Sequence, residues 1–250
     1  MKIQFYRLFV LFVILGLWEA LATSGAINPF WVASPSLIAQ RTWELTLSGE
    51  LLYHSWVTIE ETFAGLIAGT VCGVVLGLLI SINRTFGQVF EPFIIALNSL
   101  PRVALGPLLV MYVGIGFASK FLLAFSLVVV VIMLNTYEGV RSVDPTLINA
   151  LRVLQANRWQ MFTKLLLPNC IPWIFSAVRV SISFAIIGAI VGEFISSQAG
   201  IGHMIDVASG AFDTTGMLTP LMLLMLFAFA LDRLVLALSN HLMRWRASPI

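Results

Sequence analysis

Six apolar stretches, separated by shorter polar segments, form the main pattern along this chain. A helix that spans the hydrocarbon core of a bilayer needs about 20 apolar residues, because an α-helix rises only about 1.5 Å per residue. Most of the stretches approach or exceed this length, so we expect an all-α integral membrane protein with about six transmembrane helices. The stretches lie at 5–22, 62–82, 89–113, 121–134, 170–195 and 214–231, and the last continues to about residue 240.

The third stretch is broken by prolines. It contains Pro92, Pro101 and Pro107, together with the charged residues Glu91 and Arg102. Proline has no backbone N–H to donate and its ring clashes with the preceding turn, so it kinks or ends a helix. We therefore expect a short interfacial helix followed by a kinked span in this region.

The first stretch allows two interpretations. Arg7 followed by the apolar residues 8–17 resembles a signal peptide, and residues 20–22 resemble a cleavage site. Trp18 and Glu19, directly before that site, are unsuited to cleavage. We expect a retained first helix, with a cleaved signal as the alternative.

The amino-acid composition is typical of a protein embedded in lipid. Hydrophobic residues make up 59% of the 250 positions and charged residues only 10%, whereas soluble domains carry roughly 25% charged residues. A soluble protein this apolar would expose large apolar patches and aggregate. The net charge of +2 is too small to indicate a nucleic-acid partner.

The side chains that usually carry chemistry are scattered along the chain. The histidines and cysteines show no metal-ligand spacing, and no nucleophile has a base beside it in the local sequence. We therefore expect no enzyme activity, no metal and no cofactor in this chain. The residues concerned are His54, His203, His241, Cys72 and Cys170.

The distribution of Lys and Arg predicts the topology. Six spans place both termini on one side of the membrane, and loops rich in Lys and Arg face the cytoplasm. Nine such residues fall on the side of the termini and two on the other, which predicts that both termini are cytoplasmic. The nine are Lys2, Arg7, Arg84, Arg141, Arg152, Arg158, Lys164, Arg244 and Arg246, and the two are Arg41 and Lys120.

One loop is too regularly patterned to be a plain connector. The chain is predicted to form a single transmembrane domain, 1–250, and this loop occupies about 141–169. Asp144-Pro145 is a helix start, because Asp caps free N–H groups and Pro suits the first turn. Asn157 followed by Gln160 forms a near match to a capping box and marks a second start. Apolar stripes follow each start, at Leu147, Leu151 and Leu154 and at Met161, Phe162 and Leu165.

The sequence of the loop therefore predicts a helix, a turn at 155–157 and a second helix. An apolar stripe on a short helix outside the membrane suits docking into a groove of a partner protein. It equally suits a helix that lies on the membrane surface. The pattern alone leaves these two interpretations open.

Residues 149–168, Asn-Ala-Leu-Arg-Val-Leu-Gln-Ala-Asn-Arg-Trp-Gln-Met-Phe-Thr-Lys-Leu-Leu-Leu-Pro, resemble the EAA loop of binding-protein-dependent ABC permeases. That motif reads Glu-Ala-Ala, three residues, Gly, nine residues, Ile, one residue, Leu-Pro. Here Gln155 takes the place of the Gly and Asn149 that of the Glu, while the spacing to the terminal Leu-Pro is kept. The resemblance assigns ATPase coupling to Asn149, Ala150, Leu151, Leu154, Gln155, Ala156, Leu165 and Pro168.

Further short matches, in the same order along the chain, resemble the nitrate/sulfonate/taurine branch of these permeases. They are residues 27–36, Pro107-Leu108, Gly114-Ile-Gly116, Ser119-Lys120, Asn135-Thr136, Gly139-Val140, Glu193-Phe194, Gly200-Ile-Gly202 and Arg244-Trp245.

The resemblance implies a transport function and a set of partners. In this family two permease subunits form the pathway in the bacterial cell inner membrane, and a homodimer is expected here. An external binding protein delivers the solute, and the EAA loop docks on a cytoplasmic ATPase subunit. The chain has no phosphate-binding Gly-x-x-x-x-Gly-Lys-Ser/Thr loop, so ATP is expected to bind to the partner subunit. The branch implies a small anion such as nitrate, a sulfonate or taurine.

A second class of function stays open at this point. An ion-coupled secondary transporter or channel would also have several apolar spans and would need no ATPase. Such proteins often show inverted repeats and ionisable residues near the middle of the membrane. No clear internal repeat is present here, which favours the permease.

Two further groups of residues are candidates for the transport pathway. Gly65, Gly69, Gly73 and Gly77 recur every four residues and predict a smooth helix face, for packing within the subunit or at the pathway. Arg102, Arg179 and Glu193 are candidate pathway charges, because ionisable residues in spans face protein or water. Anchoring at the membrane interfaces is the alternative for these three.

Overall fold

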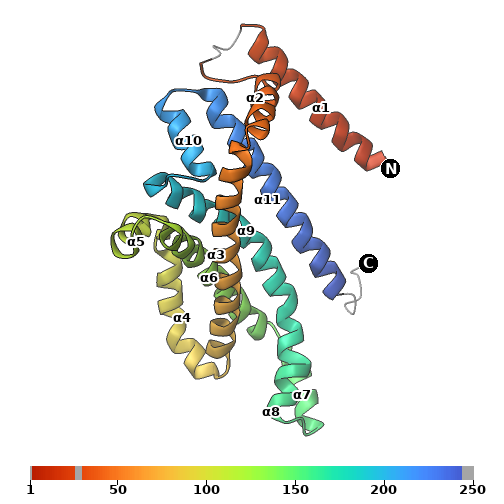
Figure 1. The fold of residues 1–250 in the computed structure, drawn as a ribbon. Coiled ribbons are helices and arrows are strands. Elements are labelled where there is room, and N and C mark those ends of the chain that lie inside the picture. Colours follow the sequence, from red (N-terminus) through yellow and green to blue (C-terminus); the bar gives the residue numbers. More distant parts are fainter. Residues whose placement is uncertain (1, 26–29, 244–250) are drawn as a thin grey trace. The chain divides into compact units, whose positions relative to one another are not determined.

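The computed structural model of the chain describes residues 2–25 and 30–243 (Figure 1). The elements in these ranges are helices, which confirms the predicted fold class. In chain order they are α1 (Lys2–Thr23), α2 (Pro35–Leu47), α3 (Glu50–Ser81), α4 (Arg84–Ser99), η1 (Arg102–Leu105), α5 (Gly106–Val113), α6 (Phe117–Arg141), α7 (Pro145–Val153), α8 (Arg158–Met161), the π-helical turn η2 (Phe162–Leu166), α9 (Leu167–Ser196), α10 (Ile201–Gly210) and α11 (Thr214–Leu242).

Five of the described helices are long and apolar enough to cross a membrane. They begin at Phe5, Glu50, Phe117, Arg158 and Thr214, and the fourth of them combines α8, η2 and α9 into 39 residues. A sixth span is obtained if the bent pair of Thr85–Ser99 and Arg102–Val113 is counted as one. The predicted number of about six is confirmed in this sense.

The predicted break in the third stretch falls at Pro101. The two arms of the bent pair meet at an angle of 74°. Leu100 ends α4 in an extended conformation with ψ 127°, as expected for a residue before proline. Pro92 lies inside α4, whereas Pro107 lies in the first turn of α5, where its missing N–H costs no hydrogen bond.

Contacts divide the chain into two compact units, each described here by itself. The first unit contains Met1–Thr58 and Ser197–Phe227. Within it, Glu19 of α1 accepts hydrogen bonds from the backbone N–H and the hydroxyl of Ser36, at 3.0 and 2.7 Å. Gly200 donates its N–H to Nδ1 of His54 at 2.9 Å, and Ile201 donates its N–H to the hydroxyl of Thr58 at 2.8 Å. These bonds fix the start of α10 against the beginning of α3.

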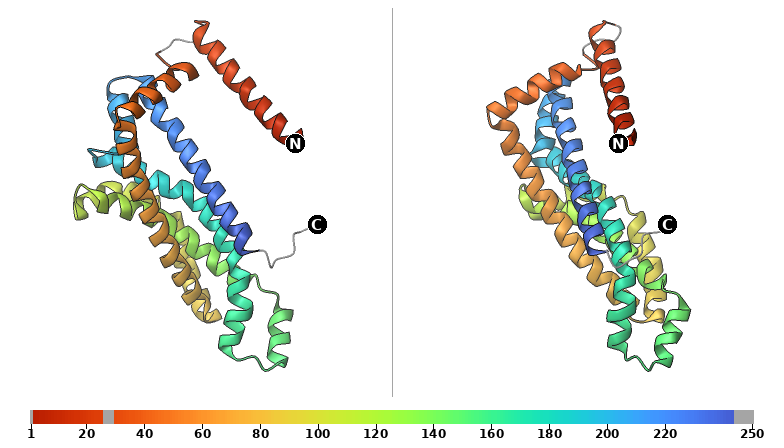
Figure 2. Two further views of the ribbon diagram at one scale, coloured as in Figure 1. Left: turned by 45° about the vertical axis from the view of Figure 1, so that its right-hand side comes forward. Right: turned by 90° about the vertical axis from the view of Figure 1, so that its right-hand side faces the viewer.

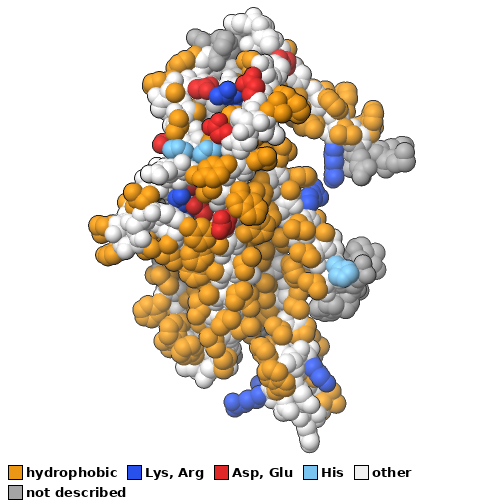
Figure 3. All heavy atoms as spheres, in the orientation of Figure 1, with side chains coloured by type: hydrophobic (Ala, Val, Ile, Leu, Met, Phe, Trp, Pro, Cys, Tyr) orange, Lys and Arg blue, Asp and Glu red, His pale blue; other side chains and the backbone are white. Residues whose placement is uncertain are grey.

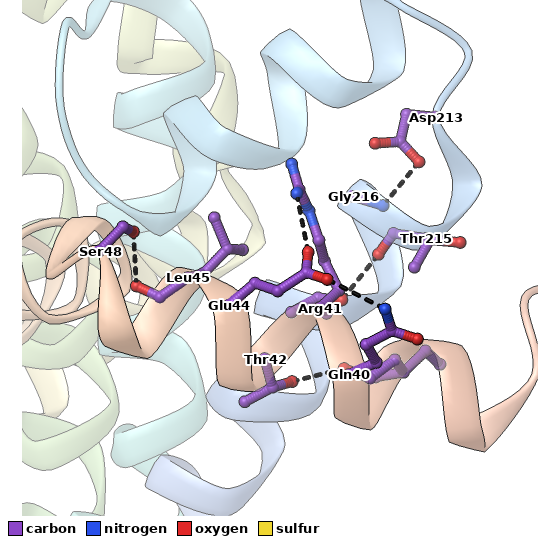
Figure 4. Close-up of polar contacts among 11 residues, drawn as sticks. Gln40, Arg41, Thr42, Glu44, Leu45, Ser48, Asp213, Thr215 and Gly216 are labelled. Atoms are coloured by element: carbon purple, nitrogen blue, oxygen red, sulfur yellow. Dashed lines mark hydrogen bonds and ion pairs between the residues drawn. The ribbon is translucent and has the colours of Figure 1, made fainter.

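Part of the exposed surface of α2 in the first unit carries a small polar network (Figure 4). Gln40 and Arg41 both reach Glu44, at 3.0 and 3.3 Å. Nearby in the same picture, the carboxylate of Asp213 accepts the N–H of Gly216 at 2.9 Å and so caps the first turn of α11. An exposed ion pair such as Arg41–Glu44 contributes little stability, so its side chains remain available at the surface.

The second unit contains Ile59–Ser196 and Ala228–Ile250. Its core lies where α3, α6 and α9 run side by side (Figure 2). α6 is the central helix of this group, and its side chains at Leu123, Ala124, Val128 and Ile132 are fully buried. The loop around 141–169 extends from the ends of α6 and α9 as two short antiparallel segments, α7 and α8, at the lower end of Figure 1.

Candidate functional site

The segment 142–166 forms a helical hairpin, called the coupling hairpin below after the role that the EAA resemblance implies. Its two helices begin at the residues expected from the sequence. The Asp144 carboxylate accepts the N–H of Thr146 at 2.8 Å and caps α7, and this backbone hydrogen bond holds the pKa of Asp144 below its usual range. Asn157 and Gln160 form a reciprocal capping box with bonds of 2.8 and 2.9 Å. These caps hold both helix starts.

The turn between the two helices contains Gln155 at φ +54°. This left-handed conformation normally favours glycine, because a Cβ crowds the backbone there. The N–H of Gln155 donates to the carbonyl of Arg152 at 2.9 Å, and that of Ala156 donates to the carbonyl of Leu151 at 3.0 Å. Gln155 is the residue that occupies the Gly place of the EAA motif, so a left-handed turn of the kind that glycine favours forms at this place without the glycine.

Several apolar side chains of the coupling hairpin have no cover within the described chain. Leu154 is 75% exposed, Val153 83% and Trp159 70%. Of the residues assigned to coupling, Asn149, Ala150, Leu154 and Gln155 are exposed, and Leu151, Ala156, Leu165 and Pro168 are half-buried. Val153 and Trp159 were missed because the stripe was traced only through Leu147, Leu151 and Leu154.

A groove of about 1190 Å³ lies between the coupling hairpin and the adjoining ends of α3, α4 and α6. Its lining combines the arginines Arg141, Arg152 and Arg158 with apolar side chains such as Ile82 and Phe162. Arg141 is paired with Glu91 at 2.9 Å. The groove is therefore cationic on the hairpin side and apolar towards the spans.

The predicted glycine face lies against α6 of the same chain. A Cβ built on Gly65 would lie 2.5 Å from Cβ of Ala124, and one on Gly69 would lie 2.7 Å from Val128. One built on Gly73 or Gly77 would lie 2.7 Å from a backbone carbonyl oxygen of α6. The two helices thus approach too closely for any larger residue, as in other small-residue interfaces between membrane helices.

One turn beyond Gly65, the same interface contains a buried group of charges. Lys120 of α6 pairs with Glu61 of α3 at 3.1 Å between Nζ and Oε1. Glu193 of α9 also interacts with Glu61. All three side chains are buried, with at most 5% of each residue exposed. The candidate pathway charge Glu193 is therefore held inside a three-helix charge cluster made of Glu61, Lys120 and Glu193.

Glu61 is absent from the sequence-based candidates because span two was started at the first residue after it. The four-residue spacing could have revealed it: Glu61 precedes Gly65 by four residues, as Lys120 precedes Ala124. Residues four apart form one ridge of a helix. Two matched ridges therefore bring the two charges to the same level.

The other two candidate pathway charges also have partners in the structure. Arg179 of α9 forms a two-point ion pair with Asp232 of α11, at 2.8 and 3.2 Å. Arg102, at the break between α4 and α5, donates to the backbone carbonyls of Ser126 and Leu127 at 2.8 and 3.2 Å. These contacts tie each arginine to a neighbouring helix.

Comparison with known proteins agrees with this architecture. Residues 69–244 match the family described as "binding-protein-dependent transport system inner membrane component". The chain belongs to this family and is a permease subunit of an ABC importer, as predicted. A chain of the methionine ABC transporter MetNI, in an inward-facing conformation, superposes with a TM-score of 0.64 at 20% identity, over 76% of this chain and 92% of that one. That likeness concerns the fold.

Among individual relatives, the chain is 36% identical to the riboflavin transport system permease protein RibX of Chloroflexus aurantiacus, over 95% of this chain and 89% of the relative. It is 28% identical to a putative aliphatic sulfonates transport permease protein, SsuC, of Bacillus subtilis, over 94% and 86%. It is 26% identical to the taurine transport system permease protein TauC of Escherichia coli, over 93% and 86%. The predicted family and its sulfonate and taurine branch are thus confirmed.

Proposed function

We propose that two copies of this chain form the solute pathway of an inner-membrane importer and that each copy receives the ATP-driven motion through its coupling hairpin. ATP binds to a separate cytoplasmic ATPase subunit, and an external binding protein supplies the solute. Both termini and the coupling hairpin lie on the cytoplasmic side, as the Lys and Arg distribution predicts. The observation that carries this proposal is the coupling hairpin, with its capped helices and its uncovered Val153, Leu154 and Trp159.

A docking role fits the way in which the coupling hairpin is attached. α7 follows α6 after a three-residue link, and α8 continues through η2 directly into α9. A force applied to the coupling hairpin therefore acts on α6 and α9, which pack tightly against each other in the second unit. A rigid helical connection of this kind transmits displacement, whereas a flexible loop absorbs it.

For the solute we propose a small anion, such as a sulfonate or taurine, as the branch implies. The relatives SsuC and TauC are named for the transport of aliphatic sulfonates and taurine. A flat heterocycle of the riboflavin type is the second candidate, favoured by the 36% identity to RibX over nearly the whole chain. Arg102 and Arg179 are engaged by backbone carbonyls and by Asp232, so an anion would compete with these partners.

The test of the proposed function is purification of the tagged chain in mild detergent, followed by mass spectrometry of the proteins that co-purify. A stoichiometric ATPase subunit is expected. A chain that purifies alone and moves solute in vesicles without ATP would instead indicate a secondary transporter. Reconstituted complexes supplied with the genetically adjacent binding protein, and with either taurine or riboflavin, would then separate the two solute candidates.

A further inference from the structure

The coupling hairpin stands clear of the membrane, to judge from the length of the helix that carries it. α8, η2 and α9 form one continuous run of 39 residues from Arg158 to Ser196, which at about 1.5 Å per residue spans roughly 58 Å. The hydrocarbon core is only about 30 Å thick, and spans tilt by about 20° on average. The apolar stretch 170–195 accounts for the membrane crossing, so α8, η2 and the turn before them lie beyond it.

The exposed apolar side chains at the hairpin tip are therefore surrounded by water unless a protein covers them. Val153, Leu154 and Trp159 lie on either side of the turn, each at least 70% exposed. A cluster of this kind at the end of a rigid projection marks a protein contact. The ring of Trp159 is packed beside that of Phe162, with centroids 5.9 Å apart, so it is presented as a rigid anchor.

The charges around this tip have one sign. Arg152 and Arg158 flank the turn, and neither has a salt bridge within the described chain. Asp144, the one acidic residue in 142–166, lies at the far end of α7 and is engaged as its cap. Figure 3 shows Lys and Arg colouring without Asp or Glu colouring at this end of the molecule.

The position of Arg158 is not explained by helix stability. It is the first residue of α8, where the helix dipole disfavours a cation. The cytoplasmic bias of Lys and Arg accounts for a positive charge on this side of the membrane, and an acidic partner outside the chain would offset its unfavourable place at the helix start. Arg152, in the last turn of α7, is compatible with the dipole and adds to the same field.

We infer that the coupling hairpin docks into an apolar cleft rimmed by carboxylates on the ATPase subunit, with Val153, Leu154 and Trp159 in the cleft and Arg152 and Arg158 against its rim. This inference rests on the proposed function and adds to it the chemistry of the partner surface. Desolvated apolar anchors supply most of the affinity, and the two arginines set orientation and association rate. Docking is therefore sensitive to salt, because exposed charges are screened.

The test measures binding of the co-purifying ATPase subunit to the full chain in nanodiscs, in the absence of ATP and at low and high salt. Arg152→Glu and Arg158→Glu are each expected to weaken binding about tenfold at low salt, because each replaces an attraction by a repulsion. Lys164→Glu is the matched control, since Lys164 is exposed on the same segment but away from the tip. Arg158→Lys should restore most of the affinity.

Three results would be decisive. If the ATPase subunit binds with an affinity that neither reversal nor salt changes, the inferred acidic rim is wrong while the proposed function stands. If no ATPase subunit binds the wild-type chain, the proposed function fails as well. The third is obtained without the ATPase: the fluorescence of Trp159, isolated by comparison with Trp159→Phe, should resist quenching by brominated lipid. Quenching would place the coupling hairpin on the membrane surface and overturn the inference.

Discussion

The coupling hairpin and the α3–α6–α9 core use the same kinds of residue in opposite ways. In the core, glycines bring the helices so close that a Cβ on Gly65 would lie 2.5 Å from Ala124, and the charges of Glu61, Lys120 and Glu193 are buried. In the coupling hairpin, Leu154 is 75% exposed and the arginines have no carboxylate partner in the described chain. The charges of the core are paired within one chain, whereas the proposed function places the partner of the coupling hairpin in a second protein.

The largest expected effect on stability comes from breaking the charge cluster. Lys120→Met leaves two buried carboxyl groups without their cation, and removal of one partner of a buried pair costs about 3–5 kcal/mol. We expect a strongly lowered unfolding temperature of the detergent-solubilised protein. Lys164→Met, which removes an exposed lysine, is the control and should leave the unfolding temperature unchanged. Equal stability of the two variants would show that the cluster does not hold the helices together.

The next largest effect concerns the close approach of α3 and α6. In Gly73→Ala the new Cβ would lie 2.7 Å from the carbonyl oxygen of Val129, so the helices must move apart at a cost of about 1–3 kcal/mol. Gly210→Ala, at a helical glycine with nothing within 4 Å of the added Cβ, provides the comparison. Thermal unfolding of both variants measures the difference, and a Gly73→Ala protein as stable as Gly210→Ala would contradict the close packing.

A smaller effect, of opposite sign, is expected at the hairpin turn. Gln155 adopts φ +54°, and a non-glycine residue in this region is strained by about 1 kcal/mol. Gln155→Gly should remove that strain and slow the hydrogen exchange of the backbone N–H groups at positions 155 and 156. Faster exchange in the variant would mean that the Gln155 side chain supports the turn.

Charged substitutions in the exposed docking face of the coupling hairpin are expected to have the smallest effect on stability and a large effect on transport. Leu154→Asp and Ala150→Asp change exposed side chains, so the unfolding free energy should change by less than about 0.5 kcal/mol. Membrane insertion should stay normal, while a charged group placed in the docking face should uncouple ATP hydrolysis from transport. Loss of insertion would show that these residues have an internal structural role.

Local signals in the sequence predicted much of this molecule. Long apolar stretches located the spans, and capping residues such as Asp144 and Asn157 located the starts of α7 and α8, because both effects depend on residues close together in the chain. The place of Gln155 in the turn followed from its alignment with the EAA glycine. A break in the third stretch followed from the geometry of its prolines, although the sequence did not say which of the three would cause it.

Contacts between distant segments were harder to predict. The pairing of Glu61 with Lys120, and of Arg179 with Asp232, depends on the relative register of two helices, which no single stretch contains. The sequence-based interpretation treated Arg179 and Glu193 as separate interfacial anchors or pathway charges for this reason. The four-residue ridges of α3 and α6 would have aligned Glu61 with Lys120, but only once the two helices were known to pack.

The most direct test of the proposed function compares Leu154→Asp with the wild-type chain, each co-purified with its ATPase subunit and reconstituted in liposomes with binding protein and solute. Uptake and ATP hydrolysis are measured in the same vesicles. If the coupling hairpin docks on the ATPase as proposed, the variant loses uptake and also loses the stimulation of ATP hydrolysis by loaded binding protein. Its unfolding temperature stays that of the wild type. Uptake at the wild-type rate, with stimulation intact, would contradict the docking of this hairpin on the ATPase.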